Sequence, residues 1–124
     1  MRTTKDEIEP QAFGEYEGRT ADLDDWRVAW ETLPAGFPPD SSPFKGLPDD
    51  RCQCLHLGVV VKGSFKVTYL DGSEELVRQG DAYRLAPGHF VQAVEHTQVI
   101  EFSPREDHER TMQQILKNVG GMSA

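Results

Sequence analysis

The sequence predicts an all-β domain of the sandwich or barrel type that ends in one α-helix. Between Cys52 and Phe102, short apolar or alternating stretches follow one another at close intervals, separated by turn residues. Short strands at this spacing are typical of a β-sandwich or barrel. After Ser103 the apolar residues recur at helical spacing instead. A chain of 124 residues is long enough for one such domain with its own core.

The first part of the chain is expected to contribute little regular structure. Residues 1–12 are polar and are predicted to be a flexible segment, followed by short strands at 13–16 and 26–32. The segment from Leu33 to Asp50 contains five prolines. Because proline lacks the N–H that a ladder needs, this segment is predicted to be a loop packed over the surface.

Most of the predicted strands lie in the middle of the chain. Apolar alternation and β-branched residues identify them, and Asp71-Gly72 is typical of a two-residue hairpin connection. The predicted strands cover residues 52–61, 64–70, 74–78, 82–85, 90–94 and 98–102.

One helix, at about residues 104–119, is expected to close the chain. Ser103 suits the N-cap, Pro104 the first helical position and Glu106 the capping box. The apolar positions of the predicted helix are Met112, Ile115, Leu116 and Val119. They form one stripe, as expected for a helix packed against the sheets or a partner.

Composition narrows the class of function. The formal net charge is −8, and such an acidic surface repels a polyanion, so DNA or RNA binding is not expected. No stretch approaches the roughly 20 apolar residues of a membrane helix, and the N-terminal residues do not have the pattern of a signal peptide. Cys-x-Cys spacing suits a disulfide poorly. We therefore expect reduced cysteines and a cytoplasmic protein that binds no membrane.

The pentapeptide Cys52-Gln53-Cys54-Leu55-His56 is the strongest functional signal. In an extended strand its thiols and imidazole would share one face, and these side chains are the ones that bind zinc most readily. Four residues of flat strand span about 13 Å. Cys52 and His56 could therefore share an ion only if the strand bends, whereas Cys54 with His56 is geometrically easier.

The stretch from Gly46 to Phe102 resembles a cupin, a small double-stranded jelly roll. The first cupin motif runs glycine, five residues, His-x-His, three or four residues, glutamate, six residues, glycine. Here five residues follow Gly46 before Cys52-Gln53-Cys54, so the cysteines lie where the paired histidines would. His56, six residues ahead of Gly63, lies at the place of the glutamate.

The second cupin motif opens with a glycine and a short strand and continues with Pro-x-Gly, two residues and a third histidine. Gly80 opens it here, and Ala86-Pro87-Gly88 matches the corner with its first proline lost. The histidine position falls at Val91, whereas the histidine present is His89. Both positions have the same parity, so His89 can still face the interior.

The positions of the possible metal ligands depart from the cupin pattern. His56 follows Cys54 after one residue rather than three or four, and a second register would place Asp50 and Cys52 at the paired positions. The chain also resembles a bacterial subgroup that carries Cys-x-Cys-x-His together with Pro-Gly-His.

The resemblance implies a cupin-type double-stranded jelly-roll β-barrel with one C-terminal helix. A single domain would then cover residues 13–124, with its core motifs at 46–102. It also implies a divalent metal in the barrel mouth, a homodimer and a small-molecule ligand. The predicted metal ligands are Cys52, Cys54, His56 and His89.

Several alternatives stay open at this point. Sulfur ligands favour zinc over iron or manganese. A saturated set would indicate a structural or sensing role, whereas an open position would permit catalysis. The thiols could also be inert core residues, and Cys54 could be an activated nucleophile. Glu101 is a further ligand candidate, while His96 and His108 are expected at the surface.

Overall fold

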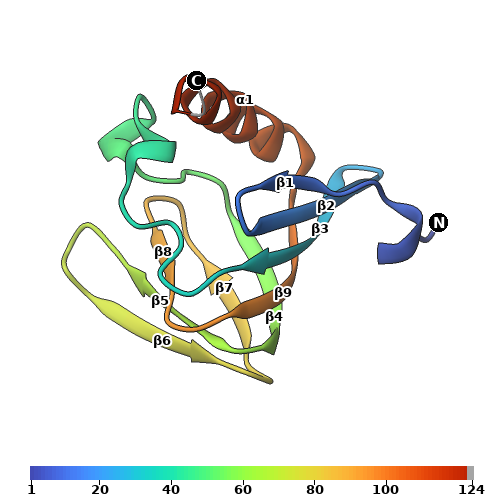
Figure 1. Cartoon of the computed structure of the whole chain (residues 1–124), viewed down its shortest axis with the longest axis horizontal. Helices are drawn as coiled ribbons and strands as arrows, with labels where there is room; N and C mark the ends of the chain where they lie inside the picture. Colours follow the sequence, from blue (N-terminus) through green and yellow to red (C-terminus); the bar gives the residue numbers. More distant parts are fainter. Residues whose placement is uncertain (123–124) are drawn as a thin grey trace.

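A computed structural model describes residues 1–122 of the chain, and within them nine strands form two antiparallel sheets (Figure 1). The larger sheet has the order β1-β2-β3-β9-β4-β7, and the smaller has the order β6-β5-β8. The elements are β1 Gln11–Phe13, β2 Tyr16–Leu23, β3 Trp26–Leu33, β4 His56–Lys62, β5 Ser64–Thr68, β6 Glu74–Arg78, β7 Ala82–Leu85, β8 Phe90–Ala93, β9 Thr97–Pro104 and α1 Arg105–Met122.

The core lies between the two sheets, because strands of both contribute buried apolar side chains to one cluster. Its members are Val60, Phe65, Val67, Val77, Tyr83, Leu85 and Val99. The rings of Phe65 and Tyr83 pack edge to face with centroids 5.1 Å apart. This alternation of inward apolar residues is what the sequence pattern predicts for strands with one buried face.

The two sheets stay open within the described residues. No ladder joins the edge strands β1 and β7 of the larger sheet to β6 or β8 of the smaller one. The arrangement is consistent with a jelly roll, but the closed barrel in the prediction is not found. The edge strands β6 and β7 are only five and four residues long, which leaves little edge to pair.

The N-terminal part has more regular structure than the sequence pattern indicates. The predicted strand at 13–16 is instead a turn: Phe13 pairs directly with Tyr16, and Gly14 adopts φ +59° between them. The following strand β2 was not predicted, because its polar residues hide the alternation. Within residues 1–12 the chain forms a 3-10 turn at Lys5–Glu7 and enters β1. Flexibility of this segment stays a prediction.

The Cys52–His56 stretch is not a continuous strand. Cys52 forms an isolated bridge with His89, residues 53–55 join no ladder, and β4 begins at His56. The chain therefore bends between the first cysteine and the histidine. This corrects the expectation of three same-face side chains on one flat strand, and it decides which cysteine lies near His56.

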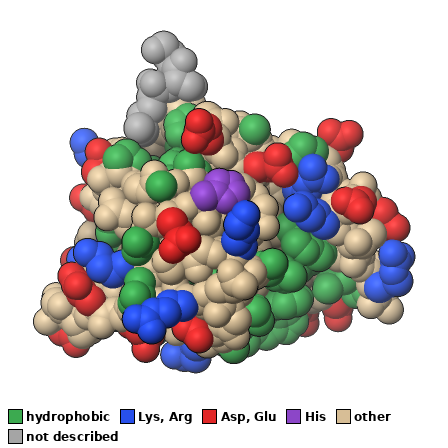
Figure 2. Space-filling view, turned by 60° about the horizontal axis from the view of Figure 1, so that its bottom comes forward, with side chains coloured by type: hydrophobic (Ala, Val, Ile, Leu, Met, Phe, Trp, Pro, Cys, Tyr) green, Lys and Arg blue, Asp and Glu red, His purple; other side chains and the backbone are tan. Residues whose placement is uncertain are grey.

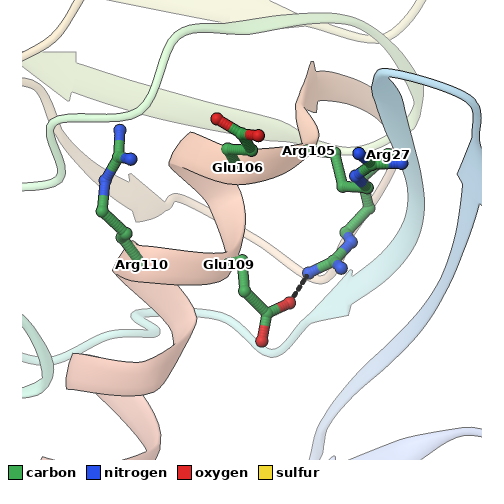
Figure 3. Close-up of a pocket in the computed structure, with 5 residues that line it drawn as sticks. All are labelled: Arg27, Arg105, Glu106, Glu109 and Arg110. Carbon is green, nitrogen blue, oxygen red and sulfur yellow. Dashed lines mark ion pairs between the residues drawn. The ribbon is translucent and has the colours of Figure 1, made fainter.

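Helix α1 begins at Arg105, one residue later than the predicted start, because β9 runs through Ser103 and Pro104. Figure 3 shows Glu109 of α1 turned toward Arg27 of β3, where their atoms lie 2.7 Å apart. Further along, Asn118 donates hydrogen bonds to the carbonyls of Pro43 and Lys45. The helix thus ties strand β3 to the proline-rich loop.

The loop itself follows the prediction after β3 ends at Leu33. It contains 3-10 turns at Ser42–Phe44 and Pro48–Asp50, and Phe44 packs edge to face on Phe90 of β8. Asn118 and Phe44 hold this loop against the rest of the molecule.

The outer face of the larger sheet carries exposed apolar side chains. Leu57, Val59 and Val61 of β4 are 38 %, 44 % and 47 % exposed, and Phe102 of the adjacent β9 is 38 % exposed. Figure 2 shows hydrophobic side chains gathered in one area of the surface, bordered by charged ones. No helix among the described residues is long and apolar enough to span a membrane.

Candidate metal centre

Three separate backbone features place three potential metal ligands together. The bridge between Cys52 and His89 aligns their backbones, and Gly88, at φ +93°, donates its N–H to the Cys52 carbonyl at 2.8 Å. His56 joins them as the first residue of β4. A turn that needs positive φ favours glycine, which explains Gly88 beside the histidine.

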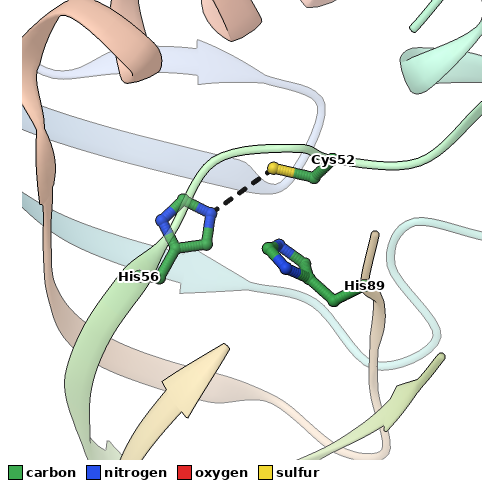
Figure 4. A group of neighbouring side chains, drawn as sticks. All are labelled: Cys52, His56 and His89. Atoms are coloured by element: carbon green, nitrogen blue, oxygen red, sulfur yellow. Dashed lines mark hydrogen bonds between the residues drawn. The ribbon is translucent and has the colours of Figure 1, made fainter. Parts of the chain in front are cut away.

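The ligand atoms of Cys52, His56 and His89 all lie within 4.8 Å of one another (Figure 4). Cys52 Sγ is 3.5 Å from His56 Nε2, and the two imidazole centroids are 4.9 Å apart. Each residue is more than 90 % buried. We refer to these residues as the Cys-His-His group.

Both imidazoles are oriented by contacts on the side away from the group. His89 Nδ1 donates to the Ala86 carbonyl at 2.7 Å. His56 Nδ1 lies 2.6 Å from Ser103 Oγ and 3.4 Å from Glu101 Oε2. A proton on each Nδ1 satisfies these oxygens and leaves the lone pair on Nε2. Such outer contacts are typical of histidines that bind metals.

Burial sets the protonation of the group. It lowers the pKa of His56 and of His89 to about 4, so both rings are neutral near pH 7. Burial also raises the pKa of the Cys52 thiol to about 12. The imidazoles are therefore ready to coordinate, while the thiol would release its proton to an incoming cation.

The ligand atoms suit a borderline-soft divalent ion. Thiolate and imidazole bind zinc at about 2.0 to 2.3 Å, which puts tetrahedral ligand atoms about 3.3 to 3.8 Å apart. The 4.8 Å limit of the group is about 1 Å wider than that, so the ligand atoms would have to move closer by side-chain rotation to hold such an ion. Three protein ligands would leave one tetrahedral position for another molecule.

Cys54, the fourth predicted ligand, is not part of this group. Its side chain is fully buried, and its Sγ lies 3.5 Å from the Leu55 carbonyl. Burial raises the pKa of this thiol to about 11, with a hydrogen bond from Ser103 and the charge of Asp107 as smaller influences. Cys54 thus reaches the group only indirectly, through the serine that contacts His56. Whether any of the four residues binds a metal stays a prediction.

The two remaining histidines lie in different environments. His96 is exposed, as expected. His108 was expected at the surface but is only 8 % exposed, because α1 turns it toward Arg27, whose Nη1 is 3.3 Å from His108 Nδ1. Burial lowers its pKa to about 4. The surface prediction for His108 is wrong.

A pair of carboxyl groups lies next to the group. Glu101 of β9 is buried and accepts a hydrogen bond from Tyr83 at 2.9 Å. Glu31 of β3 accepts one from Tyr16 at 2.9 Å, and the two carboxyl groups are hydrogen-bonded to each other. Burial, followed by the charge of Glu101, raises the pKa of Glu31 to about 7. Burial also raises the pKa of Glu101.

Sequence reasoning identified Glu101 but missed Glu31, Tyr16, Tyr83 and Ser103. The signal for Glu31 was present, since this acid lies at an inward position of the strand Trp26–Leu33. Its meaning depends on β9, which lies some 70 residues further along the chain and pairs with β3. The spacing of residues within one strand does not reveal which distant strand pairs with it.

A cavity of about 540 Å³ connects these features. Residues of the Cys-His-His group and both carboxyl groups line it, together with apolar residues of the N-terminal hairpin, the proline-rich loop and α1. The volume lies in the range of small-molecule sites. A metal held by the group would therefore face a space large enough for an organic ligand.

No protein-family model and no curated protein matches this sequence. Solved structures do match it. An RmlC-like cupin from Shewanella frigidimarina has a TM-score of 0.60 and 17 % identity, covering 86 % of this chain and 93 % of that one. Ectoine synthase from P. lautus has a TM-score of 0.61 and 11 % identity, covering 89 % and 85 %. The iron(II) form of HppE has a TM-score of 0.59 and 10 % identity, covering 83 % and 59 %.

At sequence identities this low, a structural match shows the fold and nothing further. The matches cover most of this chain. Together with the two-sheet arrangement and the turn glycines, these matches show that the chain has the cupin fold.

Proposed function

We propose that this protein binds a divalent metal ion, zinc first, through Cys52, His56 and His89, and that it binds or transforms a small organic molecule in the adjacent cavity. The observation that carries the proposal is the convergence of three buried donors, two with their outer nitrogens already engaged, on the wall of a cavity. Three buried donors whose ligand atoms lie within 4.8 Å of one another form the arrangement that a shared cation would satisfy.

Zinc is favoured by the sulfur ligand. Iron is the other ion to test, because one structure similar to this chain is an iron(II) protein. When bound, either ion would supply Lewis acidity at the cavity wall. The chain's own residues would orient His56 and His89, exclude water around the thiol, and place the carboxyl groups of Glu31 and Glu101 beside a bound molecule.

The alternative function is a non-enzymatic module in which the ion is structural or sensed. The proposed function and this alternative differ in whether the bound ion keeps an open coordination position. Cobalt(II) can replace zinc and reports its ligands through its visible absorption bands. If three protein ligands bind, adding azide to the cobalt form will shift those bands. An unchanged spectrum would favour the saturated, structural alternative.

Metal binding itself is tested with a matched pair of cysteine variants. Protein purified without added metal, and titrated with zinc against a chromophoric chelator, is expected to bind one ion. Cys52→Ser should abolish this binding, whereas Cys54→Ser should keep full stoichiometry. Equal loss in both variants would restore Cys54 as a ligand, and full retention in Cys52→Ser would contradict the proposed site.

The exposed apolar face of β4 and β9 supports the further proposal of a homodimer. A second copy presents the same face, so each chain could cover the residues Leu57, Val59 and Phe102 of the other. Light scattering during gel filtration tests the assembly: a mass of two chains is expected, and a monomer at micromolar concentration would contradict it. We also propose a cytoplasmic location, supported by the two free cysteines.

A further inference from the structure

The carboxyl pair is held on one face of the larger sheet. Ala29 pairs with Glu101 and Glu31 pairs with Val99, so the two acids are diagonal neighbours on strands β3 and β9. Tyr16 and Tyr83 each donate a hydrogen bond of 2.9 Å to one acid. Both carboxyl groups line the cavity, and Glu31 is only half-buried, since part of its side chain borders that space.

The charge around the cavity is one-sided. The acids that line it are Asp22, Glu31, Glu101 and Glu109, and the single arginine or lysine among the lining residues is Arg27. Arg27 is already engaged, at 2.8 Å from Asp22 and 2.7 Å from Glu109. The lining therefore offers no cationic side chain to Glu31 or Glu101.

The other polar contacts of the carboxyl pair come from hydroxyls and from one imidazole. Tyr16 donates to Glu31 and Tyr83 donates to Glu101, and these hydroxyls bring hydrogen bonds without charge. His56 Nδ1 lies 3.4 Å from Glu101 Oε2, so the contact of this imidazole is with Glu101.

Aromatic side chains complete the lining near Glu31. Tyr16, which donates to Glu31, stacks on Phe37 with centroids 5.2 Å apart and an angle of 19° between the rings. Phe13 and Phe44 line the same cavity. Aromatic faces attract organic cations through the negative potential of the ring, so these rings and the carboxyl groups favour the same sign of charge on a ligand.

We propose that the cavity selects a small organic molecule that carries a protonated amine, and that Glu31 is the residue that recognises this charge. A carboxylate buried without a counter-charge is unfavourable, and an ammonium group would supply that charge and donate to Glu31. Glu101 is buried and contacts His56, whereas Glu31 is only half-buried, so Glu31 is the acid with side-chain surface left for the ligand. In the metal-free protein the same arrangement disfavours organic anions. This inference rests on the proposed function only in that the ligand occupies the cavity.

The test uses three probes of nearly equal size: the cation benzylamine, the neutral benzyl alcohol and the anion benzoate. Their dissociation constants are measured by ligand-observed NMR on the full chain treated with a chelator, so that no probe can coordinate a metal. Benzylamine should bind at least about tenfold more tightly than benzyl alcohol, and benzoate should not saturate. In Glu31→Gln the affinity for benzylamine should fall about tenfold, while that for benzyl alcohol is unchanged.

Glu75→Gln is the matched control. It makes the same change of charge at an exposed position of β6 that does not line the cavity, and the amine preference should survive it. The comparison of the three probes on the unmodified protein stands even if Glu31→Gln fails to fold.

Three results would overturn the inference: benzoate binding as tightly as benzylamine, benzylamine not binding at all, or an unchanged benzylamine preference in folded Glu31→Gln. Metal stoichiometry is measured separately. A protein that prefers the amine but holds no metal would contradict the proposed metal site and leave this inference intact. A protein that binds one metal ion but shows no amine preference would contradict this inference and leave the metal site intact.

Discussion

Replacing Glu31 by glutamine should change the pH dependence of stability in a defined direction. Burial, followed by the charge of Glu101, raises the pKa of Glu31 from 4.5 to about 7. The folded protein therefore holds this proton more tightly than the unfolded chain does. The resulting stabilisation is complete below pH 4.5 and is lost as the pH rises through 7.

The magnitude follows from the size of the shift. The difference between 7 and 4.5 is 2.5 pH units, and each unit corresponds to about 1.4 kcal/mol. The wild-type protein should therefore lose at most about 3 kcal/mol through this group between pH 5 and pH 8. Glutamine keeps the shape of the side chain and an oxygen that accepts from Tyr16, but it has no proton to lose.

The assay is urea unfolding of the wild-type and Glu31→Gln proteins at pH 5 and pH 8, with chelator present throughout. The free energy of unfolding of the variant, minus that of the wild type, should become more positive at pH 8. Glu31 also influences the pKa of His56, His108 and Glu101, so the difference reports Glu31 together with these coupled neighbours. Glu75→Gln, an exposed carboxyl on β6, should give no such change. A difference that is equal at both pH values would show that the proton of Glu31 does not stabilise the folded protein in this way.

Three further predictions concern the fold and its surface. Gly63→Ala should lower the free energy of unfolding in urea by about 1 to 3 kcal/mol, because Gly63 has φ +86° and an added Cβ would collide with the His96 carbonyl. A variant as stable as the wild type would contradict this. Phe65→Ala should lower the free energy of unfolding by about 3 to 5 kcal/mol, since Phe65 is only 1 % exposed. Leu76 is 45 % exposed, so Leu76→Ala should change the free energy of unfolding by about 0.5 kcal/mol or less. Similar losses in the two variants would place the core elsewhere. Val59→Lys, on the outer face of β4, should convert a dimer to a monomer in light scattering, and an unchanged mass would rule out that face as the interface.

Sequence reasoning predicted much of the fold because the signals were local. Strands β6 and β7 lie at the predicted residues 74–78 and 82–85, between turns that the sequence marks with glycine. The helix is confirmed, although its start shifts because Ser103 contacts His56 from within β9 instead of capping α1. Hydrophobic alternation and turn residues act over a few positions, so they can be read from the chain directly.

The site was less accessible to such reasoning, because it depends on a bend and on pairings between distant segments. A flat strand would favour Cys54 over Cys52 as the partner of His56. The observed bend reverses this choice: Cys52 forms a bridge with His89, while residues 53–55 join no ladder. Likewise, the role of Glu31 follows from the pairing of β3 with β9, and the burial of His108 follows from where α1 packs.

The proposed function requires that Cys52, His56 and His89 hold one cation at the wall of the cavity. An anomalous-difference map, collected at the zinc absorption edge from crystals of protein purified without added metal, tests it most directly. We expect one strong peak within bonding distance of Cys52 Sγ and of the Nε2 atoms of both histidines. A peak centred on Cys54 or at another position, or no peak at this group in crystals soaked with zinc, would contradict it.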